Sequence, residues 1–358
     1  MIRSIVKLTS KTHRKFMCGC CSNFVGSNKI IHHEYSKVNP WNSLKEFSDF
    51  LMKNIIYNKD DIVVLNKPYG VGLSPPSTTP QRKTNTVITN TAHSGQRDYY
   101  LNMALPHIAE KLGYETLTVL KIPERYTSGV TVLSPCDKVI DKVRKCMKKA
   151  SGRHQLFAHY WAVVIGNPQP NSAVLKMGIT LKKNPNNNKD KQPVVLKEWS
   201  KNSVKCQEVK VFRVEHHTLC QQHLASLVEI RPSGTKWHFL RVYLAHMQSP
   251  ILGDNLYGSR VQTIMGVPVT INPCSDAAKS PKKLPDNLKA SLSLQPGQEV
   301  IIPTHLHLRR LILPHYLGHG DLILEAPVPS SFQWTCECLG LYQSGLGEER
   351  TFIENFNR

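Results

Sequence analysis

The sequence lacks several features that would assign it to a familiar class of protein. No run of 18 apolar residues occurs, whereas a membrane-spanning helix needs about 20, so we expect no membrane span. No stretch has the apolar core of a secretory signal peptide, and we find neither an internal repeat nor a clear linker between domains. A single domain is therefore favoured over two.

The ten cysteines form no recognisable zinc site. Five of them form clusters at positions 18–21 and 336–338 and the others are scattered, and the clusters do not supply the two C-x₂-C pairs of such a site, so we expect no metal. A chain of 358 residues can bury a sizeable apolar core without disulfide bonds. We therefore expect the cysteines to be reduced and mostly buried.

Acidic residues are absent from the first 33 positions, and Glu34 is the first in the chain. The same segment contains frequent Ser and Thr, scattered apolar residues, and the basic residues Arg3, Lys7, Lys11, Arg14, Lys15 and Lys29. This composition is typical of a mitochondrial transit peptide, and we favour that interpretation for residues 1–33. The alternative is a disordered basic arm that binds RNA or nothing. Targeting would place the protein in the mitochondrial matrix.

The rest of the chain is also short of negative charge. Over the whole sequence there are 46 basic and 26 acidic side chains, which give a net charge of +20. Such an excess favours a polyanionic partner, with nucleic acid first and an anionic membrane surface second. A basic surface without a specific partner is the third interpretation.

Periodicity predicts many strands and few helices. A capping box at residues 43–46 opens a predicted helix over 43–55, and further helices are expected over 101–112, 137–150 and 237–247. Strands are expected over 61–66, 156–165, 209–214, 225–230, 306–313 and 321–324. The pattern favours an α+β fold in which helices flank a mixed, mainly antiparallel sheet.

We expect one domain over residues 43–340, followed by a C-terminal tail over 341–358. Three polar or proline-containing stretches interrupt the predicted elements, near 74–98, 182–192 and 264–299. We interpret all three as surface insertions, and the second as a flexible hairpin.

A carboxylate stands at the start of one predicted strand. Glu124 precedes the small-residue turn 127–129, and the apolar run 130–133 that follows is typical of a buried strand. A carboxylate in this place can be a nucleophile, a general base or an ordinary charge on a loop.

Six stretches follow one another along the chain, at residues 61–70, 124–129, 160–166, 238–245, 250–257 and 306–307. Together they resemble motifs of the RluA-type RNA pseudouridine synthase family. Residues 61–70 (DIVVLNKPYG) resemble a strand that ends in Asn-Lys-Pro-x-Gly, and residues 124–129 (ERYTSG) resemble the end of its catalytic motif, His-Arg-Leu-Asp-x-x-Thr-Ser-Gly. Residues 160–166 (YWAVVIG) resemble the strand that carries its active-site tyrosine. The remaining stretches are 238–245 (HFLRVYLA), 250–257 (PILGDNLY) and the pair 306–307 (LH).

The resemblance extends over about residues 55–325 and implies specific roles. It implies that Glu124 stands in place of the catalytic aspartate, that Arg241 is its ion-pair partner, and that Tyr160 stacks on the reacting base. It also implies a mixed-sheet catalytic domain crossed by an RNA cleft.

We assign RNA contacts in that cleft to Lys67, Arg125 and His238. The implied reaction needs no metal or organic cofactor, because an isomerisation transfers no electrons and the nucleophile belongs to the protein.

The sequence departs from the family motifs at several positions. Glu124 replaces the aspartate, Ile122 falls on an arginine two places earlier, and Lys121 falls on a histidine. In the motif at 238–245, Phe239 falls on a glutamine and Tyr243 on a second histidine. We expect these departures to cluster at the site of the chemistry.

Two functional hypotheses follow from the resemblance. The first is a mitochondrial RNA pseudouridine synthase that acts on rRNA, tRNA or mRNA. The second is a catalytically impaired RNA-binding protein on the same fold, which acts on mitochondrial ribosome assembly intermediates or in RNA stability. The changes around Glu124 motivate the second hypothesis.

Overall fold

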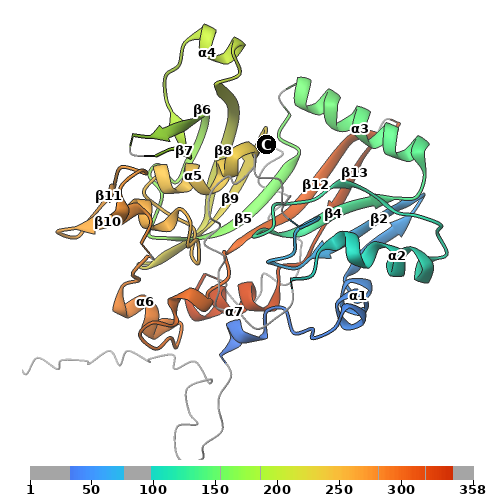
Figure 1. Ribbon diagram of the computed structural model, residues 1–358, viewed down its shortest axis with the longest axis horizontal. Helices are drawn as coiled ribbons and strands as arrows, with labels where there is room; N and C mark the ends of the chain where they lie inside the picture. The colour runs from blue at the N-terminus through green and yellow to red at the C-terminus, as the bar shows by residue number, and fades with distance from the viewer. Residues whose placement is uncertain are drawn as a thin grey trace, which may run out of the picture. The chain divides into compact units, whose positions relative to one another are not determined.

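The protein is represented by a computed structural model, which describes residues 33–75, 98–153, 155–185, 187–280, 282–318 and 320–341 (Figure 1). The fold belongs to a compact unit that begins at Glu34. The transit-peptide prediction, most of the predicted loop 74–98 and nearly all of the tail 341–358 concern residues outside these ranges, so they stay predictions.

One large sheet of 11 strands forms the core of this unit. Its main path runs β1-β2-β4-β12-β5-β9-β8-β6-β7, while β3 pairs with β4 and β13 pairs with β12. The strands are β1 Ile55–Lys59, β2 Ile62–Lys67, β3 Thr118–Lys121, β4 Ser128–Ser134, β5 Ala158–Ile165, β6 Ser172–Asn184, β7 Asn187–Leu196, β8 Val209–Gln221, β9 Ala225–Pro232, β12 Leu306–Leu317 and β13 Gly320–Glu325. Among the described strands, every pairing is antiparallel except β4 with β12, so the predicted mixed, mainly antiparallel sheet is confirmed.

Helices cover both faces of the sheet. They are α1 Leu44–Lys53, α2 Leu101–Leu112, α3 Asp137–Gly152, α4 Lys201–Lys205, α5 Phe239–His246, α6 Asp286–Ser291 and α7 Ser330–Cys338. Short 3₁₀ turns are η1 Glu34–Lys37, η4 Lys236–His238, η5 Gly258–Arg260, η6 Asp276–Ala278 and η7 Gln298–Ile301. None of the helices in the described ranges is long and apolar enough to cross a membrane.

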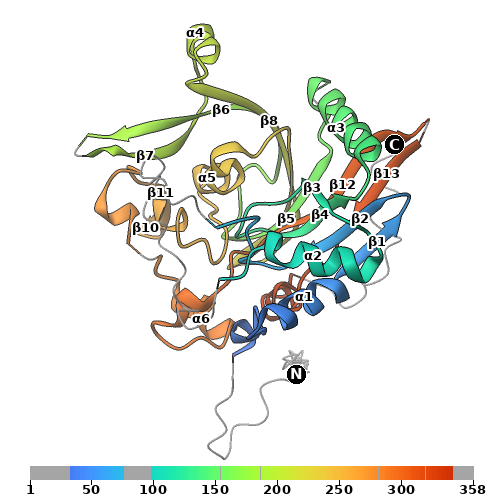
Figure 2. The same cartoon turned by 45° about the vertical axis from the view of Figure 1, so that its right-hand side comes forward.

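Alternate residues of β2 pack into two different apolar clusters, one on each face of the sheet. Ile62 and Val64 join the apolar cluster that includes α3 and α5, whereas Val63 and Leu65 join the cluster that includes α1 and α2. Successive strand residues point to opposite faces, so β2 is covered on both sides and all six of its residues are buried. Figure 2 shows α1 and α2 side by side beneath this part of the sheet.

The predicted start of α1 is confirmed by its hydrogen bonds. Ser43 Oγ accepts from the backbone N–H of Glu46 at 3.1 Å, and the Glu46 carboxylate accepts from the backbone N–H of Asn42 at 2.8 Å. The first of these bonds satisfies a donor that a helix N-terminus leaves unpaired, and the second holds the chain just before the N-cap. α2 has the predicted bounds and ends at Gly113, which adopts the left-handed conformation of a helix C-cap.

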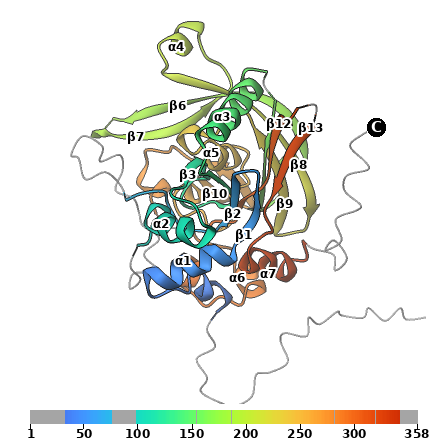
Figure 3. The ribbon, with the colours of Figure 1, turned by 90° about the vertical axis from the view of Figure 1, so that its right-hand side faces the viewer.

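Two predicted elements differ in detail from the structure. The predicted helix over 237–247 begins only at Phe239, because Trp237 and His238 have φ values of 58° and 57°. Residues 182–192 are hairpin-like, as predicted, but they continue the sheet instead of forming an insertion. Lys182 pairs with Gln192 and Lys183 with Lys191 in regular register between β6 and β7. Figure 3 shows α4 above β6.

The prediction of a surface insertion over 264–299 is wrong for the second half of that segment. Its first half contains the exposed turn of the two-stranded sheet β10 Val261–Ile264 and β11 Val267–Thr270, where Met265 is 98% exposed. In contrast, Leu288 and Leu292 have no exposed surface and pack in a cluster with Val163 of β5. Their spacing of four residues puts both side chains on one face of a helix. This spacing was the signal in the sequence that the segment is buried, although prolines surround it.

The cysteines are reduced but less buried than predicted. No disulfide joins those in the described ranges, and of these only Cys336 is fully buried, whereas Cys206 is exposed. We expected burial because cysteine is among the residue types most often buried, but most of the described cysteines do not follow this tendency.

We predict that Leu288→Ala lowers the free energy of unfolding by about 2–5 kcal/mol, because a fully buried leucine leaves a cavity when it is truncated. Met265→Ala, in the exposed half of the same segment, should change it by less than about 0.5 kcal/mol. Urea unfolding followed by circular dichroism measures both. Equal effects of the two substitutions would show that residues 284–294 do not belong to the core.

Candidate active site

The loop that carries Glu124 is fixed where it enters β4. The backbone N–H of Thr127 donates to the Glu124 carbonyl at 2.9 Å and closes the turn between them. At Gly129 the chain has φ +116°, and a Cβ atom there would lie 2.2 Å from the Leu308 carbonyl oxygen of β12. Only glycine permits both this backbone conformation and this close parallel pairing. Glu124 therefore lies in a closed turn directly before a strand whose first residues pack closely against β12.

A buried hydrogen-bond relay supports the same strand end. Ser128 Oγ lies 2.9 Å from His307 Nδ1, and His307 Nε2 lies 3.1 Å from the Ala326 carbonyl oxygen. Because a carbonyl only accepts, Nε2 carries the proton and Nδ1 accepts from the serine hydroxyl. Burial lowers the pKa of His307 to about 4, so the ring stays neutral.

A small cavity brings the three predicted catalytic residues together. Glu124 from the β3–β4 loop, Tyr160 from β5 and Arg241 from α5 all line it, together with His238 from the turn before α5. Its volume of about 40 Å³ has room for only a few water molecules. Among the described residues, no group of three or more His, Cys, Asp or Glu side chains could hold a metal ion.

Arg241 has a different ionic partner from the one we predicted. Its Nε and Nη2 atoms donate to the two carboxylate oxygens of Asp254 at 3.0 and 2.5 Å, and both side chains are buried. This is a bidentate pair, in which the planar guanidinium matches a carboxylate. The prediction that Arg241 forms an ion pair with Glu124 is therefore wrong, because the described partner of the guanidinium is Asp254, and Arg241 acts on Glu124 only through its charge.

Glu124 is thus left as a carboxylate in the cavity without a bidentate partner. Its burial raises its pKa to about 7, and the negative charge of Asp254 acts in the same direction. The positive charges of Arg241 and Lys121 oppose this rise. Near neutral pH the group is divided between its protonated and ionised forms.

His238 faces the cavity in a constrained conformation. Trp237 and His238 both have positive φ angles, which residues other than glycine seldom adopt and which often mark functional sites. His238 Nδ1 lies 2.6 Å from the Tyr257 hydroxyl, and burial together with the charge of Arg241 lowers the pKa of His238 to about 4. The ring is therefore neutral beside Glu124, and its contact with RNA stays a prediction.

Lys67 cannot contact RNA in this structure. The side chain has no exposed surface, and its ammonium group donates to the carbonyls of Val71 at 2.8 Å, Pro68 at 3.1 Å and Arg125 at 3.4 Å. Burial lowers its pKa to about 7. The prediction of an RNA contact is wrong, because Lys67 instead ties the turn after β2 to the loop that carries Glu124.

Arg125 points away from the cavity. Its Nη2 donates to Asp98 at 2.7 Å, its Nε donates to the Gly70 carbonyl at 2.9 Å, and its guanidinium lies 5.6 Å from the ring centres of Tyr100 and Tyr126. Arg125 is partly exposed, so its predicted RNA contact stays a prediction.

The departures from the family motifs do not all lie at this cavity. Lys121, Ile122 and Glu124 line it, as expected. Phe239 instead packs against Phe212 in the core with ring centres 5.0 Å apart, and the Tyr243 hydroxyl lies 2.7 Å from His216 Nδ1. The prediction that all departures cluster at the chemistry is therefore wrong for Phe239 and Tyr243.

Asp254 and Tyr257 are site residues that our sequence analysis did not single out. Besides holding Arg241, Asp254 Oδ1 accepts from the backbone N–H groups of Leu256 and Tyr257, each at 3.0 Å. The Tyr257 ring lies 5.0 Å from the Arg241 guanidinium. Both residues belong to the noted stretch 250–257, where a carboxylate within an apolar turn was a signal of a buried partner.

Comparison with known proteins identifies the family of the chain. No family model matches the chain. A mouse protein named mitochondrial mRNA pseudouridine synthase Rpusd3 is 30% identical over 305 residues, which cover 84% of this chain and 81% of the mouse protein. The chain belongs to the RluA-type pseudouridine synthase family. Its human relative RPUSD3 is 26% identical over 337 residues, covering 93% of this chain and 88% of that protein.

A solved structure shows the fold of this family. Human RNA pseudouridylate synthase domain containing 4 superposes with a TM-score of 0.61 at 23% identity, and the match covers 84% of this chain and 98% of that one. The pseudouridine synthase fold is thus confirmed, whereas the residue roles rest on the geometry above.

We predict that Asp254→Asn lowers the free energy of unfolding by about 3–5 kcal/mol, because it leaves the Arg241 guanidinium buried without its counter-charge. Asp286→Asn is the matched control, since it breaks the exposed Asp286–Lys289 pair and should have little effect. Urea unfolding at pH 7.5 compares the two. Equal stability of Asp254→Asn and the unsubstituted protein would show that this ion pair does not hold the site together.

Proposed function

We propose that the protein is a mitochondrial RNA pseudouridine synthase, which isomerises uridine to pseudouridine within an RNA chain in the matrix. One observation carries the proposal, namely that a carboxylate, a buried tyrosine and a buried arginine line one cavity at the family's motif positions. The names of the mouse and human relatives support the mitochondrial and RNA parts of the proposal, and they favour mRNA over rRNA and tRNA as the substrate.

The reaction assigns a role to each of these groups. The target uridine leaves its stack and enters the cavity, where it packs on the Tyr160 ring. Ionised Glu124 attacks the nucleoside or assists cleavage of its N1–C1′ glycosidic bond, and the freed uracil turns. A bond then forms between C5 and C1′, which releases the carboxylate if it was bound to the sugar, and C5 loses its proton to solvent while N1 gains one. A cavity of about 40 Å³ is too small for a nucleotide, so the loops that carry Glu124 and His238 have to separate before the base enters.

Glutamate in place of aspartate changes the reach of the carboxylate by one methylene. A displacement of about 1 Å can cost on the order of 100-fold in rate, which is small beside typical enzymatic accelerations of at least about 10⁶-fold. Glu124 is therefore compatible with turnover.

A second function is favoured by a specific observation. Arg241 is paired with Asp254, and its charge does not overcome the burial that raises the pKa of Glu124 to about 7, so the protein would be an RNA-binding protein with little or no catalytic activity. In that case it would act on ribosome assembly intermediates or on RNA stability.

Deletion and rescue distinguish the two functions. In cells that lack the gene, we predict that at least one mitochondrial pseudouridine disappears and that the unsubstituted protein restores it, whereas Glu124→Ala does not, because the reaction requires the carboxylate. Pseudouridine-specific sequencing of mitochondrial RNA provides the measurement. Tyr57→Phe, which removes a hydroxyl on β1 from a residue outside the cavity lining, is the control and should restore the site. Normal pseudouridine in the deletion cells would favour the RNA-binding function.

We also predict a distinct pH dependence of the single-turnover rate. Because burial raises the pKa of Glu124 to about 7 and the reaction requires the ionised form, the rate should fall about tenfold per pH unit below 7 and level off above it. Tritium release from a [5-³H]uridine RNA that contains the mapped site, between pH 5.5 and 8.5, measures this. A flat profile over that range would contradict a buried Glu124 carboxylate as the reacting group.

A further inference from the structure

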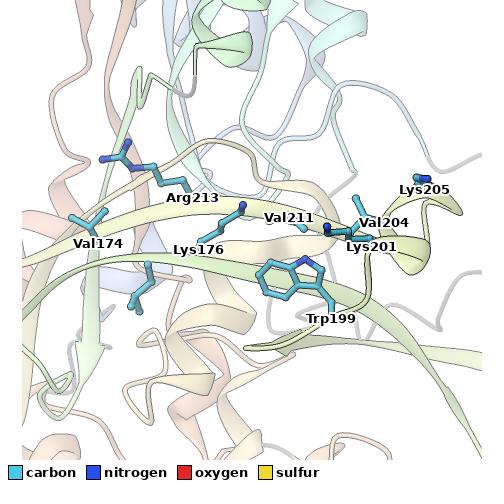
Figure 4. Close-up of a pocket in the computed structure, with 9 residues that line it drawn as sticks. Val174, Lys176, Trp199, Lys201, Val204, Lys205, Val211 and Arg213 are labelled. Carbon is cyan, nitrogen blue, oxygen red and sulfur yellow. The ribbon is translucent and has the colours of Figure 1, made fainter.

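A second and larger concavity lies away from the active site. The connection from β7 to β8, which contains α4, crosses over β6 and leaves a groove of about 720 Å³ between them (Figure 4). Trp199 and α4 form one wall, and residues of β6 and β8 form the other. The proposed reaction uses none of these residues.

Trp199 is built into this wall. A Cβ atom at Gly178 of β6 would lie 2.8 Å from Trp199 Cε3, so the absence of a side chain there lets the indole rest on the strand. The rest of the ring lines the groove and is partly exposed. A tryptophan supported on one side and open on the other is a platform on which a flat ring can stack.

The remaining lining is basic and apolar. Lys176, Lys201, Lys205 and Arg213 are exposed around the groove, and no carboxylate belongs to its lining. Within the described ranges, none of these four side chains forms an ion pair. Val204 is 38% exposed in the same wall. Unpaired positive charges around an aromatic ring match a phosphate chain that carries flat bases.

The groove and the active site lie on opposite faces of the sheet. Val211 and Arg213 line the groove, whereas Phe212 between them packs against Phe239 of α5. Side chains alternate between the two faces of a strand, and α5 is the helix that supplies Arg241 to the active site. The groove is therefore a separate site.

We propose that this groove binds a single-stranded segment of RNA, with one base stacked on Trp199 and the neighbouring phosphates held by Lys176, Lys201, Lys205 and Arg213. The inference rests on the proposed function, because it takes RNA as the partner. A single strand fits better than a duplex, since the bases of a duplex are already stacked and cover one another. The enzyme would thus hold its RNA at two places.

Fluorescence anisotropy with a 5′-fluorescein (U)₁₂ oligonucleotide tests the stacking contact. Trp199→Leu keeps apolar packing on Gly178 but removes the aromatic ring, and it should weaken binding by about tenfold. Trp199→Phe retains a ring and should bind within about threefold of the unsubstituted protein. Unchanged binding by Trp199→Leu, or equal losses in both variants, would overturn the inference.

The dependence of affinity on salt tests the phosphate contacts. In the double variant Lys201→Ser/Lys205→Ser, the slope of log K against log[salt] should become shallower by about 1.4, since each contact with a single strand contributes about 0.7. Lys45→Ser/Lys53→Ser removes two exposed charges from α1 and should leave the slope unchanged. Equal slopes for the two double variants would overturn the inference, as would equally strong displacement of (U)₁₂ by polyglutamate.

The experiments can contradict the groove inference and the proposed function separately. If Trp199→Leu weakens (U)₁₂ binding while deletion of the gene removes no pseudouridine, the groove is an RNA site and the enzymatic function is wrong. If Glu124→Ala abolishes the modification while Trp199→Leu binds (U)₁₂ normally, the enzymatic function stands and the groove inference is wrong.

Discussion

The buried ion pair between Arg241 and Asp254 is the interaction on which the arrangement of the site depends. It joins α5 to the turn over 250–257, and the Asp254 carboxylate also accepts two backbone N–H groups of that turn. Tyr257 extends the connection to His238 through its hydroxyl. Two desolvated charges with complete hydrogen bonding are tolerated in the interior, whereas either one alone would be costly. The pair therefore fixes which residues face the cavity.

The family resemblance had implied that Arg241 pairs directly with Glu124, but the structure shows it paired with Asp254. Arg241 organises the cavity through Asp254, and it acts on Glu124 only through its charge, whose effect on the pKa of Glu124 the charge of Asp254 opposes. Glu124 therefore remains a buried acid whose charge depends on conditions near neutrality. Entry of an RNA segment would change its surroundings, because any group that replaces water or approaches with charge alters the balance between the two forms.

Sequence information was sufficient where the signal was local. The capping box before α1 and the glycine after α2 specified their ends through contacts within a few residues. The motifs also placed Glu124, Tyr160 and Arg241 in one cavity. They did not show which of two nearby carboxylates Arg241 would bind, because that choice depends on a geometry formed only by the folded chain. The predicted RNA contact of Lys67 was wrong for a similar reason. Lysine is usually exposed, and the carbonyl partners of Lys67 come from separate segments of the chain.

The close approach of Gly129 to Leu308 has a consequence for synthesis of the protein. The strand that positions Glu124 pairs with β12, which lies almost 180 residues later in the chain. During translation the loop around Glu124 is made long before its supporting strand leaves the ribosome. Such distant pairing is slow to form, because a long segment must be closed first. Until β12 has been synthesised, the nascent chain has all three cavity residues but lacks the strand that lies between β4 and β5 in the sheet. A transcript that ends before the codon for residue 306 would therefore encode a protein without an assembled site.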